Sequence, residues 1–361
     1  MGEYARSLAI AHAVRRQWPQ ASIHFILSRQ APYAAAAPYP ATLLDSSPTF
    51  HTAAVVESIQ TFRPNIVIFD NAGRTAQLRA ANRAGARIVF ISSRARQRRK
   101  AFRWRWMRLI DEHWIAYPQF IAGRLNFLER FKLRRLSRPC IRYLDVILSR
   151  LRGQEDPIIS RMGLNHEAYV LVVPGGGTGH PRAGDATAKF LAAANTLADT
   201  GVTVFVGPTG RAHAGPSSPL STHAAVPASQ LPGAQLPSSQ LPNSQLRHFN
   251  ALPQADLAEL MSSARLVITN GGSTLLQAIA CGRACIAAPI AQDQPQRIQR
   301  CVEAEVAIAA RLDASSMAQA AGDLLRDESA RVALARRARA LGLADGIEVA
   351  LGALTQLMNT A

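Results

Sequence analysis

The chain has 361 residues, of which 48% are hydrophobic, and its 41 basic and 24 acidic residues give a net charge of +17. This length suits two domains with full cores, and no apolar run approaches the length of a membrane span. The first residues lack a signal-peptide pattern, and the four cysteines lack the spacing of a zinc site or a disulfide framework, so we expect a cytoplasmic protein.

Helical and strand patterns alternate through the first part of the chain. Gly2–Trp18 has a helical period, with Glu3 in its first turn, where a carboxylate favours the helix dipole. Asp70 directly follows a strand pattern, so it either faces a ligand cleft or caps the helix expected over Thr75–Ala84. The predicted strands are Ser22–Leu27, Ile66–Phe69, Arg87–Ser92 and His113–Ala116.

Basic residues are concentrated between Arg94 and Arg152, where 17 Lys or Arg stand against four Asp or Glu. Such a patch indicates an anionic partner, and interleaved Arg and Trp favour an interfacial helix on an anionic membrane surface. The alternative is a solvated helix with its aromatic residues in the core; nucleic acid is disfavoured, because no recognition motif accompanies the charge. The residues expected to contact the membrane or another anion are Arg98, Arg99, Lys100, Arg103, Trp104, Arg105 and Trp106.

A second α/β region follows a polar stretch. The strand expected over Ala168–Val173 leads into Gly175, Gly176, Gly177, Thr178 and His180. A glycine run between strand and helix permits close approach of a diphosphate, and His180 either contacts that phosphate or lies on the loop surface. Segment 211–246 is rich in Pro, Ser, Ala and Gln and cannot support a core, so we expect a disordered insertion.

A βαβ unit covers residues 266–297. Its first strand ends before Asn270, and Gly271, Gly272, Ser273 and Thr274 open a helix whose free N–H groups favour a phosphate. After the second strand, Asp293 and Gln294 offer hydrogen-bonding groups suited to sugar hydroxyls. Because parallel strands place ligands outside their carboxyl ends, both turns are expected to line one crevice.

This unit resembles the donor-binding signature of GT-B glycosyltransferases, especially the branch of MurG, the N-acetylglucosaminyltransferase of peptidoglycan synthesis. Two departures from that signature are present: Gln277 stands where a ribose-binding Glu is usual, and Arg283-Ala284 replaces x-Pro after Gly282. As a neutral amide, Gln277 can still bond ribose hydroxyls, but more weakly. The segment that contacts the nucleotide base in this family falls near Phe249, which alternatively belongs to the core.

The resemblance implies an α/β fold of the GT-B type, with two Rossmann-like doubly wound domains facing a cleft. Residues 1–152 would bind the acceptor, 153–167 would form a linker, 168–345 would bind the nucleotide sugar, and 346–361 would form a helix crossing back to the first domain. Family members have a strand before the first helix, and that strand is missing here. We therefore expect that Met1 is an internal start or that the chain is shortened.

The resemblance also implies an enzyme that moves a sugar from a UDP-sugar to a lipid-linked or glycan acceptor in cell-envelope synthesis. It would act with inversion, without a cofactor or an essential metal, at the inner face of the cytoplasmic membrane. The base expected for the acceptor hydroxyl is Glu3, at the place of the family's loop His, or Asp70. The alternatives are a UDP-sugar hydrolase of the pseudaminic-acid-pathway type and a non-catalytic membrane or nucleic-acid adaptor on a decayed GT-B scaffold.

Overall fold

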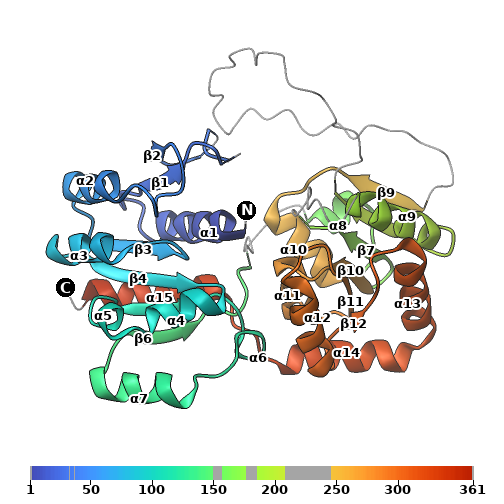
Figure 1. Cartoon of the computed structure of the whole chain (residues 1–361). Helices are drawn as coiled ribbons and strands as arrows, with labels where there is room; N and C mark the ends of the chain where they lie inside the picture. The colour runs from blue at the N-terminus through green and yellow to red at the C-terminus, as the bar shows by residue number, and fades with distance from the viewer. Residues whose placement is uncertain are drawn as a thin grey trace, which may run out of the picture.

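The computed structural model describes residues 2–31, 33–35, 37–148, 157–175, 185–207 and 245–359. Figure 1 shows two lobes, which we call the first domain and the second domain. Every described strand pair is parallel, and helices cover the sheets, so both domains are α/β as predicted.

The first domain contains a sheet in two parts. One part pairs β1 with β2, the other has the order β3-β4-β5-β6, and no ladder joins β1 to β3 among the described residues. Strand β1 is half-buried throughout, as is most of β3. The strands are β1 (Phe25–Ser28), β2 (Ala41–Leu44), β3 (Ile66–Asp70), β4 (Arg87–Ser92), β5 (Glu112–Ile115) and β6 (Cys140–Tyr143).

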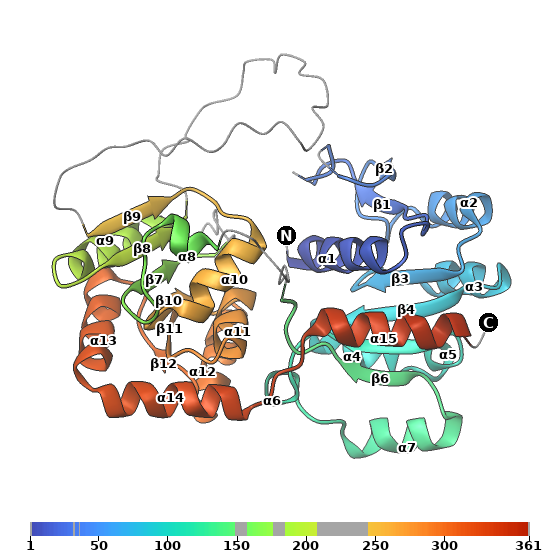
Figure 2. The same cartoon turned by 180° about the vertical axis from the view of Figure 1, so that it is seen from behind.

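Alternate side chains of β4 are buried on opposite faces of the main sheet of the first domain. Ile88 and Phe90 pack against α2, α3, α4 and α5, whereas Val89 and Ile91 pack against α1 and the C-terminal helix α15 (Gly346–Asn359). Figure 2 shows α1 and α15 together on their face of this sheet. The other helices are α1 (Gly2–Gln17), α2 (Thr52–Phe62), α3 (Thr75–Arg83), α4 (Ala95–Ala101), α5 (Trp104–Met107), α6 (Gln119–Ala122) and α7 (Phe127–Leu136).

The Arg/Trp segment is not one interfacial helix, which corrects the sequence interpretation. It is divided into α4 and α5, and Trp106 is fully buried, with its Nε1 donating to Thr75 Oγ1. Arg98 is also buried, and the Lys100 ammonium lies 4.4 Å from the Trp106 ring centre and donates to a backbone carbonyl. Arg99, Arg103, Trp104 and Arg105 stay exposed, so only part of the predicted contact set faces solvent.

The second domain has one six-stranded sheet in the order β12-β11-β10-β7-β8-β9. The chain enters at β7, runs outward to β9, and then returns to continue from β10 in the opposite direction. The switch point between β7 and β10 is where an open α/β sheet binds its ligands. The strands are β7 (Val170–Val173), β8 (Thr203–Val206), β9 (Leu246–Phe249), β10 (Leu266–Asn270), β11 (Cys285–Ala288) and β12 (Ile308–Ala309).

The helices of the second domain cover both faces of its sheet. α8, α10, α11 and α12 pack with one side-chain layer, and α9 and α13 pack with the other. They are α8 (Ile158–Arg161), α9 (Ala186–Ala198), α10 (Gln254–Ser263), α11 (Ser273–Ala280), α12 (Gln294–Glu303), α13 (Ala314–Arg326) and α14 (Glu328–Ala340). None of the helices in the described ranges is long and apolar enough to cross a membrane.

Two of the predicted boundaries need correction. Ile158, Ile159 and Leu164 are buried in the core of the second domain, so the segment 153–167 is not a linker over its whole length. Leu246 begins β9, so the proposed insertion 211–246 ends too late; residues 211–244 of it lie outside the described part of the chain. Apolar contacts with a neighbouring element, rather than local polarity, decide both boundaries.

His113 of β5 is completely buried, and its Nε2 lies 2.8 Å from Ser92 Oγ on β4. Burial, reinforced by the charge of Arg98, lowers the pKa of His113 from 6.5 to about 3. The unfolded chain therefore binds this proton at a higher pH than the folded chain. The stability that depends on neutral His113 is complete above pH 6.5 and is lost progressively as the pH falls toward 3.

We expect His113→Gln to reduce the loss of stability in acid. Between pH 7 and pH 5, the free energy of unfolding of the wild type should fall by about 2 kcal/mol more than that of the variant, because each pH unit below 6.5 costs about 1.4 kcal/mol. Urea unfolding at several pH values measures the difference. The two proteins should behave alike between pH 7 and 8, and equal losses down to pH 5 would contradict the assignment.

Candidate functional site

Asn270 joins the two halves of the second sheet at the switch point. Its side chain is buried; Nδ2 donates to the Pro174 carbonyl after β7 at 2.5 Å, and Oδ1 accepts from the Gly272 N–H at 2.6 Å. Both ends of the amide are therefore used inside the protein. Asn270, predicted to bind the donor, instead holds together the two turns expected to do so.

Two glycines permit this close approach. Gly175 has a φ of +79°, and a Cβ there would lie 2.3 Å from Asn270 Nδ2. A Cβ on Gly272 would lie 2.6 Å from Asn270 Oδ1. Side chains at either position would separate the turns, so packing requires both glycines, and the positive φ of Gly175 favours glycine there as well. Gly176, Gly177, Thr178 and His180 lie outside the described residues.

Gln294 and Arg297 hold Gly271 from the other side. Gln294 Oε1 accepts from the N–H groups of Gly271 at 3.2 Å and Ile290 at 2.8 Å. Arg297 donates to the Gly271 carbonyl and to Asp293 Oδ2, at 2.5 and 2.8 Å. Gln294 was predicted to read a sugar, but its carbonyl oxygen is engaged in the turn. Arg297 was missed, although its position four residues after Asp293 on a helix is a signal for an ion pair.

The start of α11 remains open to a ligand. Ser273 is exposed and Thr274 half-buried, and neither hydroxyl has a hydrogen-bond partner among the described residues. The first N–H groups of this helix lack intrahelical partners, and its dipole favours an anion. The start of α11 therefore presents free hydroxyl and N–H groups of the kind that bind a phosphate.

Two other residues that were predicted to bind the nucleotide sugar make contacts within the protein. Gln277 Nε2 donates at 2.9 Å to the Ile147 carbonyl, which leaves Oε1 and one N–H of Nε2 for a ribose hydroxyl. Phe249 is half-buried and packs against the core of the second domain, in line with its alternative interpretation. Asp293 stays accessible, with 71% of its side chain exposed.

Glu3, Asn71 and Ser93 meet at the carboxyl edge of the first sheet. Asn71 has a left-handed backbone, with a φ of +55°, and its Nδ2 donates to Glu3 Oε1 at 2.8 Å and to Ser93 Oγ at 2.5 Å. The Ser93 N–H returns a bond to Asn71 Oδ1 at 2.8 Å. The end of α1 that carries Glu3 points toward the second domain (Figures 1 and 2). This places an exposed carboxylate at the edge of the first domain that faces the second domain. Sequence reasoning missed Asn71 and Ser93.

Asp70 is not placed to act as a base, which corrects the second of the two predictions. Arg6 donates to both of its carboxylate oxygens, at 2.5 and 3.1 Å, and Ser7 Oγ donates at 3.0 Å. Burial raises the pKa of Asp70, and the charge of Arg6 opposes this effect only in part. With a side chain only 10% exposed, Asp70 anchors α1 to β3 and is closed to an acceptor.

A cleft of about 470 Å³ lies between the domains. The ends of β4 and β5, the N-terminal part of α4 and the loop before α7 line one wall, and α12 lines the other. Arg297 connects this cleft with the donor turn, since it contacts Gly271 and its guanidinium lies 4.8 Å from the ring centre of Tyr117 in the first domain. Ser93 connects the cleft with Glu3 through Asn71.

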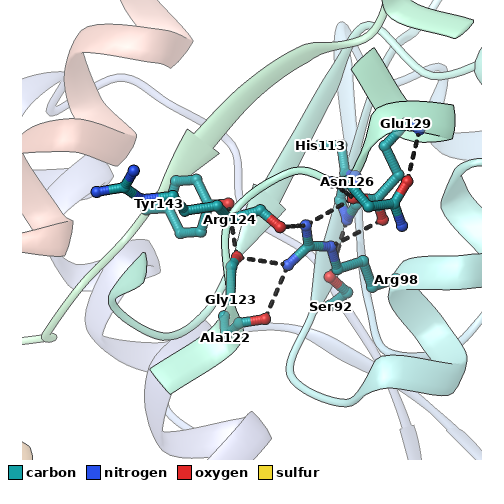
Figure 3. A network of polar contacts seen from close by, with 9 residues as sticks. All are labelled: Ser92, Arg98, His113, Ala122, Gly123, Arg124, Asn126, Glu129 and Tyr143. Carbon is teal, nitrogen blue, oxygen red and sulfur yellow. Dashed lines mark hydrogen bonds and ion pairs between the residues drawn. The ribbon is translucent and has the colours of Figure 1, made fainter. Parts of the chain in front are cut away.

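Arg98 fixes the wall of the cleft in the first domain (Figure 3). Its guanidinium donates to both carboxylate oxygens of Glu129 at 2.7 and 3.0 Å. It also donates to the carbonyls of Ala122, Gly123 and Arg124, at 2.8 to 2.9 Å. A buried ion pair of this kind is tolerated because its remaining donors are satisfied. These hydrogen bonds fix the loop that carries Arg124 at the cleft.

No family model matches the sequence, and no curated protein matches it. Solved structures are similar over nearly the whole chain. CalG4, the calicheamicin glycosyltransferase, has a TM-score of 0.58 and 18% identity, over 98% of this chain and 94% of that one. UGT2 of Phytolacca americana has a TM-score of 0.60 and 13% identity, over 99% and 97%.

A UDP-N-acetylglucosamine 2-epimerase is also similar, with a TM-score of 0.53 and 13% identity, over 98% of this chain and 92% of that chain. The likeness thus extends to transferases and an epimerase alike and does not single out the MurG branch. The chain has the GT-B fold, with two Rossmann-like domains around a cleft.

Proposed function

We propose that the protein is a glycosyltransferase that moves a sugar from a UDP-sugar to an acceptor hydroxyl in the cleft between its domains. One observation carries this proposal: residues that line one cleft contact both candidate groups, Arg297 at the Gly271 turn before α11 and Ser93, through Asn71, at the carboxylate of Glu3. A phosphate-binding helix end in one domain and a general base in the other are the groups that glycosyl transfer needs.

In this proposal the donor diphosphate lies at the N-terminus of α11. The Ser273 and Thr274 hydroxyls and the free N–H groups bind its oxygens, and the helix dipole stabilises the charge that develops on the leaving UDP. The accessible Asp293 carboxylate accepts hydrogen bonds from the donor sugar. Because the helix end and the cleft arginines supply positive charge, the reaction as proposed requires no metal and no other cofactor.

Glu3 would remove the proton from the acceptor hydroxyl. Asn71 holds Glu3 Oε1 and leaves the second oxygen for the acceptor proton. A single displacement, in which the acceptor oxygen attacks the anomeric carbon opposite UDP as the bond to UDP breaks, would invert the anomeric centre. We propose an acceptor that is linked to a lipid and used in cell-envelope synthesis. The support for the lipid is a membrane-docking surface on α7.

Helix α7 lies at the edge of the first domain (Figure 1), and its exposed residues are both apolar and basic. Phe127, Leu128 and Phe131 are 73, 63 and 52% exposed, and they lie one helical turn from one another or closer. The helix also carries exposed arginines, and its single acid, Glu129, is buried against Arg98. Apolar residues beside basic ones suit a peripheral position on anionic lipid, where each basic residue contributes about 1 kcal/mol.

Calorimetry with UDP tests the donor site, with GDP and dTDP as controls. We expect UDP to bind the wild type and Gly272→Trp to abolish binding, because the indole would displace Asn270 and cover the start of α11. Gly201→Trp is the matched control: a Cβ there meets open space, in the turn before β8 and away from the switch point. If no nucleotide binds the wild type, the donor site is wrong and a non-catalytic adaptor becomes the better explanation.

Glu3→Gln should lower the turnover number by about 100-fold or more, the usual contribution of a general base, while UDP affinity stays unchanged. UDP release from UDP-N-acetylglucosamine, with and without a polyprenyl-linked acceptor, measures it. Asp70→Asn should instead destabilise the fold by about 3 kcal/mol or more, since it leaves the buried Arg6 charge without a carboxylate. Full activity of Glu3→Gln would contradict its role, and products formed without acceptor would indicate a hydrolase or an epimerase.

Flotation with vesicles of phosphatidylglycerol and phosphatidylcholine tests the α7 surface. The double variant Phe127→Ser/Phe131→Ser should bind the vesicles with an affinity lower by about tenfold or more, because it lacks the two apolar side chains that would be buried in the lipid. Phe50→Ser is the control, since Phe50 is 71% exposed but lies outside α7. Equal binding of all three proteins, or binding to purely neutral vesicles, would contradict docking through this helix.

A further inference from the structure

The cleft between the domains has an excess of positive charge that the protein does not neutralise. Six arginines line it, with only two acids, Glu129 and Asp293. Glu129 is bound by Arg98 and Asp293 by Arg297, so both acids are already paired. The lining arginines are Arg94, Arg98, Arg99, Arg124, Arg297 and Arg300.

Three of these arginines are available to a ligand. Arg94, Arg99 and Arg124 are exposed, and none forms an ion pair within the described ranges. Arg300 of α12 donates to the Ile121 carbonyl of the first domain, so its positive charge lies against the first-domain wall of the cleft. Uncompensated like charges in a cleft repel one another and attract an anion.

A second observation indicates a missing acceptor of hydrogen bonds. Arg297 is 8% exposed and uses both terminal nitrogens, yet its Nε is buried without a hydrogen-bond partner in the described part of the chain. A buried charged donor left unsatisfied is costly, and an oxyanion in the cleft is a suitable partner. The lining does not include Gly272, Ser273 or Thr274, so this anion is distinct from the donor diphosphate at α11.

We propose that this cleft binds a phosphate or diphosphate group carried by the acceptor, through Arg94, Arg99 and Arg124 of the first domain and Arg297 and Arg300 of the second. The inference rests on the proposed transferase function and names the chemical class of its acceptor. A volume of about 470 Å³ accommodates a diphosphate with an attached sugar. Arginine forks suit phosphate oxygens, and Asp293 at the same cleft places this group next to the donor sugar.

Calorimetric titration of inorganic pyrophosphate into protein saturated with UDP tests the cleft, because UDP then fills the donor site. We expect one pyrophosphate to bind per chain, and Arg94→Gln/Arg99→Gln to lower its affinity by about tenfold or more. Arg134→Gln/Arg135→Gln is the matched control: it removes the same charge from exposed positions on α7, outside the cleft, and should change the affinity less than about twofold.

Each outcome has a separate meaning. Absence of pyrophosphate binding to the UDP-loaded wild type, or equal loss in both double variants, would overturn the proposal. Titration with glucuronate tests whether the cleft prefers a carboxylate. If glucuronate binds more tightly than pyrophosphate, and its binding requires Arg94 and Arg99, the anion belongs to an acidic sugar and the phosphate assignment is wrong. If UDP itself does not bind, the proposed function fails, whereas titration of the UDP-free protein and the same variants still tests the cleft.

Discussion

The two hydrogen bonds of the Asn270 side chain are the constraint on which the donor side of the site depends. They connect the turn after β7 with the turn after β10, the two points where the chain passes from the centre of the second sheet to its two halves. A buried amide with both ends satisfied stabilises this junction, whereas an unsatisfied one would cost about 1 to 3 kcal/mol. Since Asn270 occupies the inner groups of the turn, the outward N–H groups and hydroxyls of α11 are left for a ligand.

The buried and the exposed arginines of the cleft wall differ in whether their charge is neutralised. Inside the wall, Arg98 is neutralised by Glu129 and saturated by three backbone carbonyls, so it acts as a structural element of the loop before α7. At the surface, Arg94, Arg99 and Arg124 have no carboxylate to neutralise them among the described residues. The same excess of arginine in the sequence therefore serves two purposes, and only burial distinguishes them.

The fold by itself does not decide the reaction. Proteins with this fold include glycosyltransferases and a UDP-N-acetylglucosamine 2-epimerase, so the assignment has to come from the site. In this chain the arrangement of Glu3, Asn71 and Ser93 places a carboxylate and a hydroxyl at the edge of the first sheet, next to a cleft that is also lined by Arg297. The excess of arginine in this cleft favours an anionic ligand.

The sequence by itself determined most of the strands and the glycine and hydroxyl turn at 271–274, because these depend on local periodicity and on turn residues, and the resemblance of residues 266–297 to a family signature implied the GT-B fold. It did not indicate α7 or the strand β6, whose patterns are short and mixed with arginine. Only the tertiary structure decided which polar groups are free. The Asp70 carboxylate is bound by Arg6, 64 residues away, one N–H of Gln277 is used by Ile147, 130 residues away, and Trp106 is buried in the core, whereas Glu3 stays accessible. A residue's type and its neighbours in sequence specify what it can bind, but contacts from distant segments determine whether that capacity has already been used.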